Sequence, residues 1–131
     1  MEEEIYDTFN NDKGFIKDNG YKLIELDKDH AKMECIVTKK GLNPIDIAHG
    51  GLLFGLADTV AGALASMSGK FPLTTSSTIN YLNPVKEGKI YAISKVLKQG
   101  NKLGFYESKI YDENDLLLCE ATVTMYFVKK K

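Results

Sequence analysis

The sequence has few of the residues that crosslink small proteins or bind metals. It contains 2 cysteines and 2 histidines in 131 residues, and Cys35 and Cys119 form no CxxC pair. This scarcity argues against a disulfide framework and against a zinc site, which needs a clustered set of such ligands. We expect no bound metal, and we interpret the cysteines as buried free thiols in a reducing cytoplasm.

An excess of charge of one sign is also lacking. The 17 basic and 18 acidic residues leave a net charge of -1, which argues against a nucleic-acid-binding protein with its usual basic excess. The start, Met1-Glu2-Glu3-Glu4, lacks the basic and apolar segments of a secretory signal. We therefore expect a cytoplasmic protein that binds no nucleic acid.

Several catalytic and nucleotide-binding motifs are missing too. No GxSxG sequence occurs, so Ser66 and Ser68 are not convincing nucleophiles. There is no P-loop, dinucleotide fingerprint, internal repeat or linker. The length predicts one domain over 1–131, in which residues 1–19 form a polar, partly helical lead-in.

Most of the remaining chain has the period-two alternation of half-buried strands. This pattern predicts strands over 21–26, 31–38, 74–82, 89–98, 103–111 and 117–127. Between the second and third strands, residues 52–67 are apolar nearly all round, which predicts a buried helix. The helix is shorter than the roughly 20 apolar residues of a membrane span and carries a central carboxylate, so we expect no membrane insertion.

The order of these elements predicts the fold class. Short loops between strands favour antiparallel neighbours, and an all-apolar helix needs cover on every side. We predict an α+β domain whose antiparallel sheet wraps around a central buried helix. A narrow face of small residues on that helix would let a backbone approach closely; it comprises Gly55, Thr59, Gly62 and Ser66.

Asp58 is the most informative residue of the predicted helix. It shares the segment 47–69 with only one other ionisable side chain, His49. An isolated carboxylate in a buried helix is costly unless it is paired or hydrogen-bonded. Asp58 is therefore either a structural residue bonded to backbone or to Thr59, or a catalytic base or nucleophile.

The run Ala48-His49-Gly50-Gly51 lies where the helix begins. The first amides of a helix are unpaired and lie at the positive end of its dipole. Two such N–H groups would suit an oxyanion, although a capping turn explains the run equally well. His49 and Asp58 lie about 13 Å apart along a helix and on opposite sides. A site that uses both ends therefore needs two copies of the chain.

Three segments together resemble one known family. Residues 43–51 (NPIDIAHGG), 56–58 (LAD) and 79–84 (INYLNP) are similar to the hotdog thioesterases of the phenylacetic-acid-degradation type, in the same branch as the 4-hydroxybenzoyl-CoA thioesterases. The resemblance covers residues 20–128. It implies a hotdog fold and a homodimer or homotetramer that hydrolyses acyl-CoA to a free acid and CoA. No cofactor is implied, since CoA is part of the substrate.

The resemblance also implies residue roles. Asp58 would activate water or attack the thioester, and the Gly50 N–H would bind the carbonyl oxygen. Asn43 would place the substrate or the water, while His49 would order the loop. For the hydroxyl that holds the water, Thr74 matches best; Thr75 and Ser76 are close rivals.

Other positions are less sharply defined by the resemblance. Asp46 stands where the family often has glycine, a departure that would reshape the loop or add a carboxylate near the acyl site. The expected substrate contacts are Gly51, Phe54 and Tyr81, with Lys86, Lys102 and, less specifically, Lys98 as candidates for the CoA phosphates.

Three other functions compete with hydrolysis. A non-catalytic acyl-CoA binding or sensing protein would use Asp58 structurally. A hotdog dehydratase needs a histidine and a carboxylate poised together, and His49 and Asp58 are too far apart in one chain. A transcriptional regulator needs a DNA-reading element, for which residues 1–19 are too short and too acidic. The acyl group stays open, as does the choice between base and nucleophile for Asp58.

Overall fold

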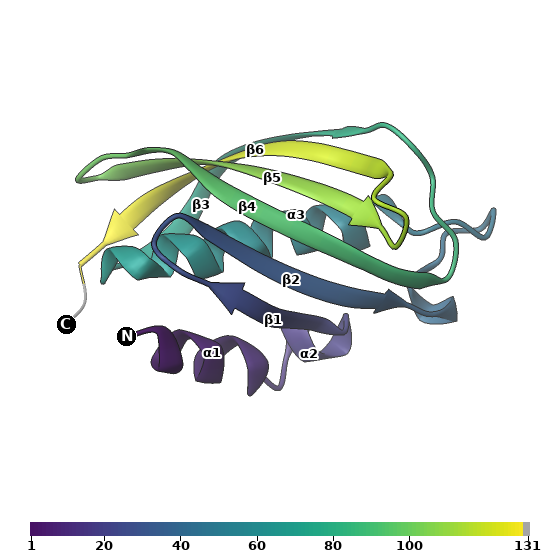
Figure 1. The fold of residues 1–131 in the computed structure, drawn as a ribbon, viewed down its shortest axis with the longest axis horizontal. Coiled ribbons are helices and arrows are strands. Elements are labelled where there is room, and N and C mark those ends of the chain that lie inside the picture. Colours follow the sequence, from purple (N-terminus) through teal and green to yellow (C-terminus); the bar gives the residue numbers. More distant parts are fainter. Residues whose placement is uncertain (130–131) are drawn as a thin grey trace.

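A computed structural model describes residues 1–129 as a curved sheet with one long helix on its inner face (Figure 1). The helices and short 3-10 turns are α1 (Glu2–Asn10), α2 (Phe15–Asp18), η1 (Lys39–Gly41), α3 (Gly50–Ala65) and η2 (Ser66–Ser68). The strands are β1 (Tyr21–Leu26), β2 (His30–Val37), β3 (Phe71–Tyr81), β4 (Gly88–Gln99), β5 (Leu103–Asp112) and β6 (Leu117–Val128).

The six strands form one sheet in the order β1-β2-β4-β5-β6-β3, and every neighbouring pair is antiparallel. The expected order of two strands, a helix and four strands is confirmed. After β2 the chain forms α3, which crosses the inner face of the sheet, and then reaches the far edge as β3. Strand β3 therefore lies beside β6, the last strand of the chain.

Helix α3 is apolar on nearly every side because it supplies the centre of the core. Leu56, Val60 and Leu64 are fully buried on it. The sheet covers these residues with the inward-facing side chains of its strands, which include Met33, Ile90, Ile110 and Val123. By length and composition alone, the stretch Gly50–Ser68 would be sufficient to span a membrane; here it packs against the sheet.

Two details differ from the sequence-based expectation. Strand β3 begins at Phe71 and includes Pro72, which an edge strand tolerates because it has one side without ladder hydrogen bonds. At Gly55, one of the small residues of α3, side chains rather than a backbone make the close approach. A methyl group at Gly55 would meet the Tyr21 hydroxyl at 2.5 Å and the Phe15 ring at 3.1 Å, so aromatic side chains occupy this space.

The two edges of the sheet are finished differently. At β1, the Asn10 side chain pairs with the backbone of Leu23 like a short strand: its Nδ2 donates to the Leu23 carbonyl at 3.0 Å, and its Oδ1 accepts from the Leu23 N–H at 2.9 Å. At the other edge, β3 pairs with β6 only. This 11-residue strand has no charged residue, although charges normally protect exposed edges from pairing.

Candidate active site

Asp58 lies in the middle of α3, half-buried, opposite the start of β3. Its Oδ1 accepts a hydrogen bond of 2.5 Å from the Thr74 hydroxyl. The register of β3 shifts by a bulge between Thr74 and Ser76, and bulges of this kind re-aim side chains. The hydrogen bond therefore goes to Thr74, and neither to Thr59, the structural partner that the sequence offered, nor to Thr75 or Ser76.

At the start of α3, all but one of the first amides are engaged. His49 is the N-cap, and its Nδ1 accepts from the Gly51 N–H at 2.8 Å. The His49 carbonyl accepts from Leu52 and Leu53 at 3.0 and 3.2 Å. Within residues 1–129, the Gly50 N–H has no acceptor. The sequence suggested two free amides here; the structure leaves one, at the positive end of the helix dipole.

The loop before α3 is organised by the side chain of Asn43. Its Oδ1 accepts from the backbone N–H groups of Ile45 and Ile47, at 3.0 and 3.2 Å. Asp46 adopts a left-handed backbone with a φ of 62°. Glycine adopts this conformation most readily, and aspartate is among the few other residues that tolerate it. Asp46 thus occupies a conformation that suits glycine.

Two adjoining hollows meet at Asn43. One, of about 330 Å³, is largely apolar and includes Gly50, Leu53 and Tyr81 in its lining. The other, of about 700 Å³, is lined mainly by polar and charged side chains, Asp46 and Lys86 among them. The apolar hollow thus reaches the helix start at Gly50, and the charged hollow lies along the loop that precedes it.

The expected substrate contacts fall at two ends of the molecule. Gly51 and Phe54 lie exposed on the first turns of α3, and Tyr81 contacts the same helix at Gly50. Lys102 lies in the β4–β5 turn, where its carbonyl accepts from the Phe127 N–H, far along the sheet from the loop that carries Lys86. One chain therefore does not bring Lys86 and Lys102 together.

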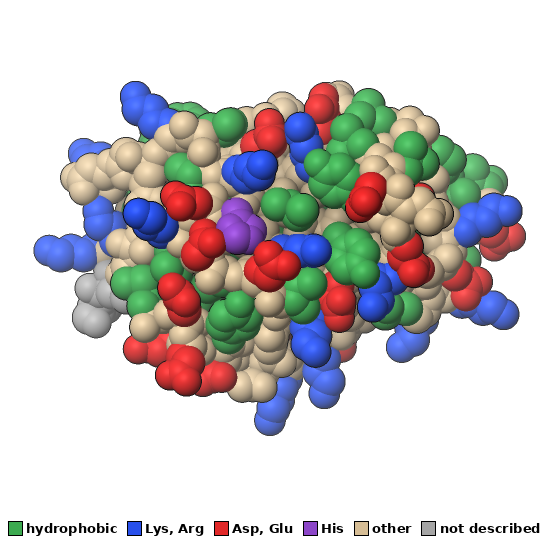
Figure 2. Space-filling view, viewed as in Figure 1, with side chains coloured by type: hydrophobic (Ala, Val, Ile, Leu, Met, Phe, Trp, Pro, Cys, Tyr) green, Lys and Arg blue, Asp and Glu red, His purple; other side chains and the backbone are tan. Residues whose placement is uncertain are grey.

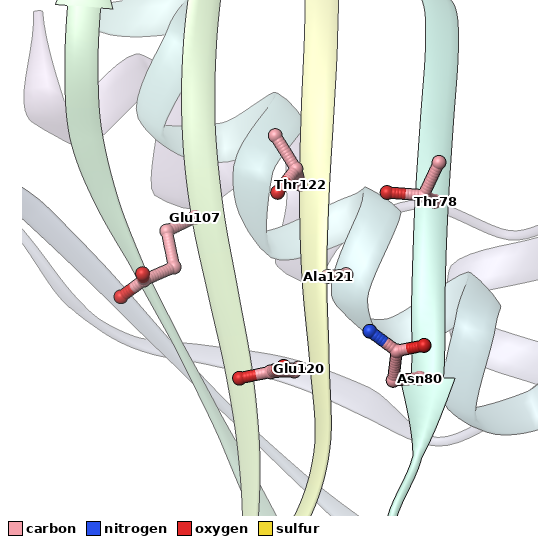
Figure 3. Close-up of a pocket in the computed structure, with 6 residues that line it drawn as sticks. All are labelled: Thr78, Asn80, Glu107, Glu120, Ala121 and Thr122. Atoms are coloured by element: carbon pink, nitrogen blue, oxygen red, sulfur yellow. The ribbon is translucent and has the colours of Figure 1, made fainter.

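A third hollow, of about 240 Å³, lies on the outer face of the sheet (Figure 3). Polar side chains of β3, β5 and β6 line it, among them Thr78, Glu107 and Glu120. Thr78 and Glu120 alternate with residues that face α3, so this hollow is separated from Asp58 by the sheet. On the face seen in Figure 2, acidic side chains gather at the lower left, and acidic and basic side chains are interspersed over the rest.

The remaining titratable groups near the core do not suggest additional chemistry. Burial raises the pKa of the Cys35 and Cys119 thiols to about 11, so both stay protonated near neutral pH. Both are free and buried, as expected. Within residues 1–129, no three histidine, cysteine or carboxylate side chains are grouped to hold a metal ion.

Within one chain, the free Gly50 N–H and the Asp58 carboxylate are eight residues apart on the same helix. This corresponds to about 12 Å along the axis. A hydrolytic site needs an attacking group and an oxyanion donor on the same carbonyl. One copy of the chain contains both the carboxylate and the N–H group but cannot place both at the same carbonyl group.

Known proteins resemble this chain in sequence. The sequence profile of the thioesterase superfamily matches residues 46–119. The chain is 36% identical to a putative esterase of Archaeoglobus fulgidus, covering 83% of this chain and 71% of the relative. It is 32% identical to the acyl-coenzyme A thioesterase PaaI of Escherichia coli, covering 72% of this chain and 68% of PaaI.

Solved structures show the same fold. The Escherichia coli PaaI structure superposes with a TM-score of 0.93, covering 99% of this chain and 95% of PaaI at 24% identity. A Streptococcus mutans protein solved with acetyl-CoA bound gives a TM-score of 0.82 at 26% identity, covering 86% of this chain and 91% of that protein. The expected hotdog fold is thereby confirmed.

Proposed function

The chain belongs to the thioesterase superfamily as a hotdog-fold thioester hydrolase, and on that premise we propose that it hydrolyses acyl-CoA to a free acid and CoA. The observation that carries the proposal is the pairing of Asp58 with Thr74 on one side and the unoccupied Gly50 N–H on the other. Relatives named for acyl-CoA hydrolysis, and the relative with bound acetyl-CoA, support CoA as the leaving group.

We further propose that each site combines two subunits. The uncharged, unprotected edge of β3 suits pairing with the same strand of a second copy. Within residues 1–129, Ser77 carries the one buried side-chain oxygen without a hydrogen-bond partner, and it lies near the middle of β3. Two antiparallel β3 strands centred on Ser77 would give each hydroxyl a partner. They would also bring Thr74 and Asp58 of one chain beside Gly50 of the partner subunit.

In this arrangement, Asp58 takes a proton from water as the water oxygen attacks the thioester carbon, or attacks the carbon itself. Thr74 holds the carboxylate, or the water, through its hydroxyl. The negative charge that forms on the carbonyl oxygen is stabilised by the Gly50 N–H and by the helix dipole. When water attacks, the C–S bond breaks and the CoA thiolate takes up the proton held by Asp58. When Asp58 attacks, breaking the C–S bond leaves an anhydride between the acyl group and Asp58; water then hydrolyses this anhydride to the free acid and Asp58, and the proton released goes to the CoA thiolate.

Free-thiol release from short, medium, long and aryl acyl-CoAs tests the proposal. Asp58→Asn should lower kcat at least about 100-fold, the usual scale for a general base. Thr74→Val should also lower kcat, whereas Thr75→Val, a matched change at an exposed neighbour, should not. Near-normal turnover by Asp58→Asn would remove Asp58 from the mechanism. Tight acyl-CoA binding with no release by the unaltered protein would favour the binding or sensing alternative.

Mixed dimers test the shared site. A dimer that joins an Asp58→Asn subunit to an Asn43→Ala subunit should retain one intact site, so activity should recover above that of either variant alone. No recovery in verified mixed dimers would contradict the two-subunit geometry. A cytoplasmic location, cofactor-free hydrolysis and the single-domain organisation stay predictions.

A further inference from the structure

The side chain of Tyr81, at the end of β3, lies directly against the first turn of α3. Its hydroxyl donates a hydrogen bond of 2.9 Å to the Gly50 carbonyl oxygen. A methyl group added at Gly50 would meet the Tyr81 hydroxyl at 3.2 Å and Cζ at 3.3 Å, so the ring is in contact as well. The open edge strand is thus bound to the helix start of its own chain.

This contact fixes the peptide between Gly50 and Gly51 at both of its polar atoms. The carbonyl of that peptide accepts from Tyr81, and its N–H donates to His49 Nδ1 at 2.8 Å. The preceding peptide carries the free Gly50 N–H. Because consecutive glycines have the widest backbone freedom, the direction of that N–H depends on how firmly the neighbouring peptide is held.

Tyr81 is itself well placed to hold the peptide. It pairs with Cys119 of β6, and the next residue, Leu82, donates its N–H to the Leu118 carbonyl at 2.8 Å. Partial burial raises the pKa of the Tyr81 hydroxyl, with a smaller contribution from Cys119. The hydroxyl therefore stays protonated at neutral pH and remains a donor to the carbonyl.

We propose that Tyr81 is a positioning residue that aims the Gly50 N–H at the thioester carbonyl oxygen. This role rests on the proposed function, since it requires that Gly50 bind that oxygen. Tyr81 acts through Gly50 and, within the part of the chain that the structure describes, its hydroxyl is hydrogen-bonded to neither Asp58 nor Thr74. Loss of its hydroxyl should therefore weaken transition-state stabilisation more than substrate binding.

Tyr81→Phe keeps the ring and removes only the hydroxyl. Tyr126→Phe is the matched control, because Tyr126 is a similarly exposed tyrosine on the outer face of β6. We expect Tyr81→Phe to lower kcat about 5- to 30-fold, less than the roughly 100- to 1,000-fold cost of losing an oxyanion donor outright. The KM should stay within about twofold. Equal kcat values for the unaltered protein and both variants would overturn the role.

A second measurement does not depend on turnover. Infrared difference spectra of acyl-CoA labelled with carbon-13 at the carbonyl report how strongly the bound C=O is polarised. In the Asp58→Asn protein, the carbonyl band should shift to lower frequency on binding, and adding Tyr81→Phe should reduce that shift. Adding Tyr126→Phe instead should leave it unchanged.

The outcomes separate the two proposals. An undiminished shift in the Tyr81→Phe protein overturns the positioning role even where hydrolysis is established. Binding of acyl-CoA without hydrolysis by the unaltered protein refutes the proposed function, and the carbonyl shift then decides the role of Tyr81 alone. If acyl-CoA does not bind at all, both the assignment of the site and the positioning role of Tyr81 are refuted.

Discussion

Replacing Gly55 with alanine should destabilise the protein, although alanine is the better helix former. The added methyl group would lie 2.5 Å from the Tyr21 hydroxyl, which is not free to move because it donates a buried hydrogen bond of 2.6 Å to the Leu52 carbonyl. Losing that bond costs about 1 kcal/mol, and overpacking adds about 1 to 3 kcal/mol. The higher helix propensity of alanine offsets about 1 kcal/mol of this cost. We expect a net loss of about 2 kcal/mol.

Gly62 on the same helix provides the control. A methyl group there would have Met125 Cε as its nearest neighbour at 3.8 Å, an ordinary contact. Gly62→Ala should therefore stabilise the protein by up to about 1 kcal/mol. Thermal unfolding at equal protomer concentration should separate the two variants, with Tm changing by about 3 to 4 °C per kcal/mol for a chain of this length.

A double-mutant cycle identifies the cause of the Gly55→Ala effect. In a Tyr21→Phe background, the hydroxyl that the new methyl group would meet is absent, so Gly55→Ala should cost much less there. The reasoning fails if Gly55→Ala is as stable as Gly62→Ala. It also fails if the cost of Gly55→Ala is the same with and without the Tyr21 hydroxyl.

Two further predictions concern the β1 side of the sheet. Asn10→Ala removes both hydrogen bonds to Leu23 and should cost about 1 to 3 kcal/mol; faster hydrogen exchange at the Leu23 N–H would check it, and unchanged exchange would contradict it. Hydrogen bonds to Glu25 and Asp27 raise the pKa of His30, so its stabilisation is present below pH 6.5 and lost as pH rises through the raised pKa. His30→Gln should therefore lower the free energy of unfolding at pH 5.5, by less than about 1 kcal/mol for so exposed a cluster, and lower it less at pH 8.5. Thermal unfolding at the two pH values checks this, and equal losses at both would refute it.

Much of the fold could be predicted because one physical cause shapes each segment. Each strand has a face against α3 and a face toward solvent, so buried and exposed residues alternate along the sequence with a period of two. The expected strands accordingly match the observed ones to within three residues at each end. The largest difference, the start of β3, arises at Pro72, which signals a strand boundary in the sequence but is tolerated at an edge.

The site could be predicted only in part, because its contacts join distant segments. The isolated Asp58 and the glycines at the helix start carry signals of their own, a buried charge and a close approach to backbone. The hydrogen bond between Tyr81 and Gly50 joins residues 31 positions apart, and no periodic pattern in the sequence indicates it. The choice of Thr74 over Thr75 follows from a bulge, which alternation alone does not locate.

The difference between the two sheet edges connects the proposed dimer with the proposed reaction. Asn10 closes the β1 edge, so β3 is the edge through which the sheet can extend. The same strand holds Asp58 through Thr74 and the helix start through Tyr81, seven residues apart. In the proposed dimer, antiparallel pairing of this strand with its copy places one end of each strand beside the other end of its partner. The strand that joins the subunits would then also align the attacking group with the oxyanion donor, so any change of register at β3 should abolish catalysis while leaving each fold intact.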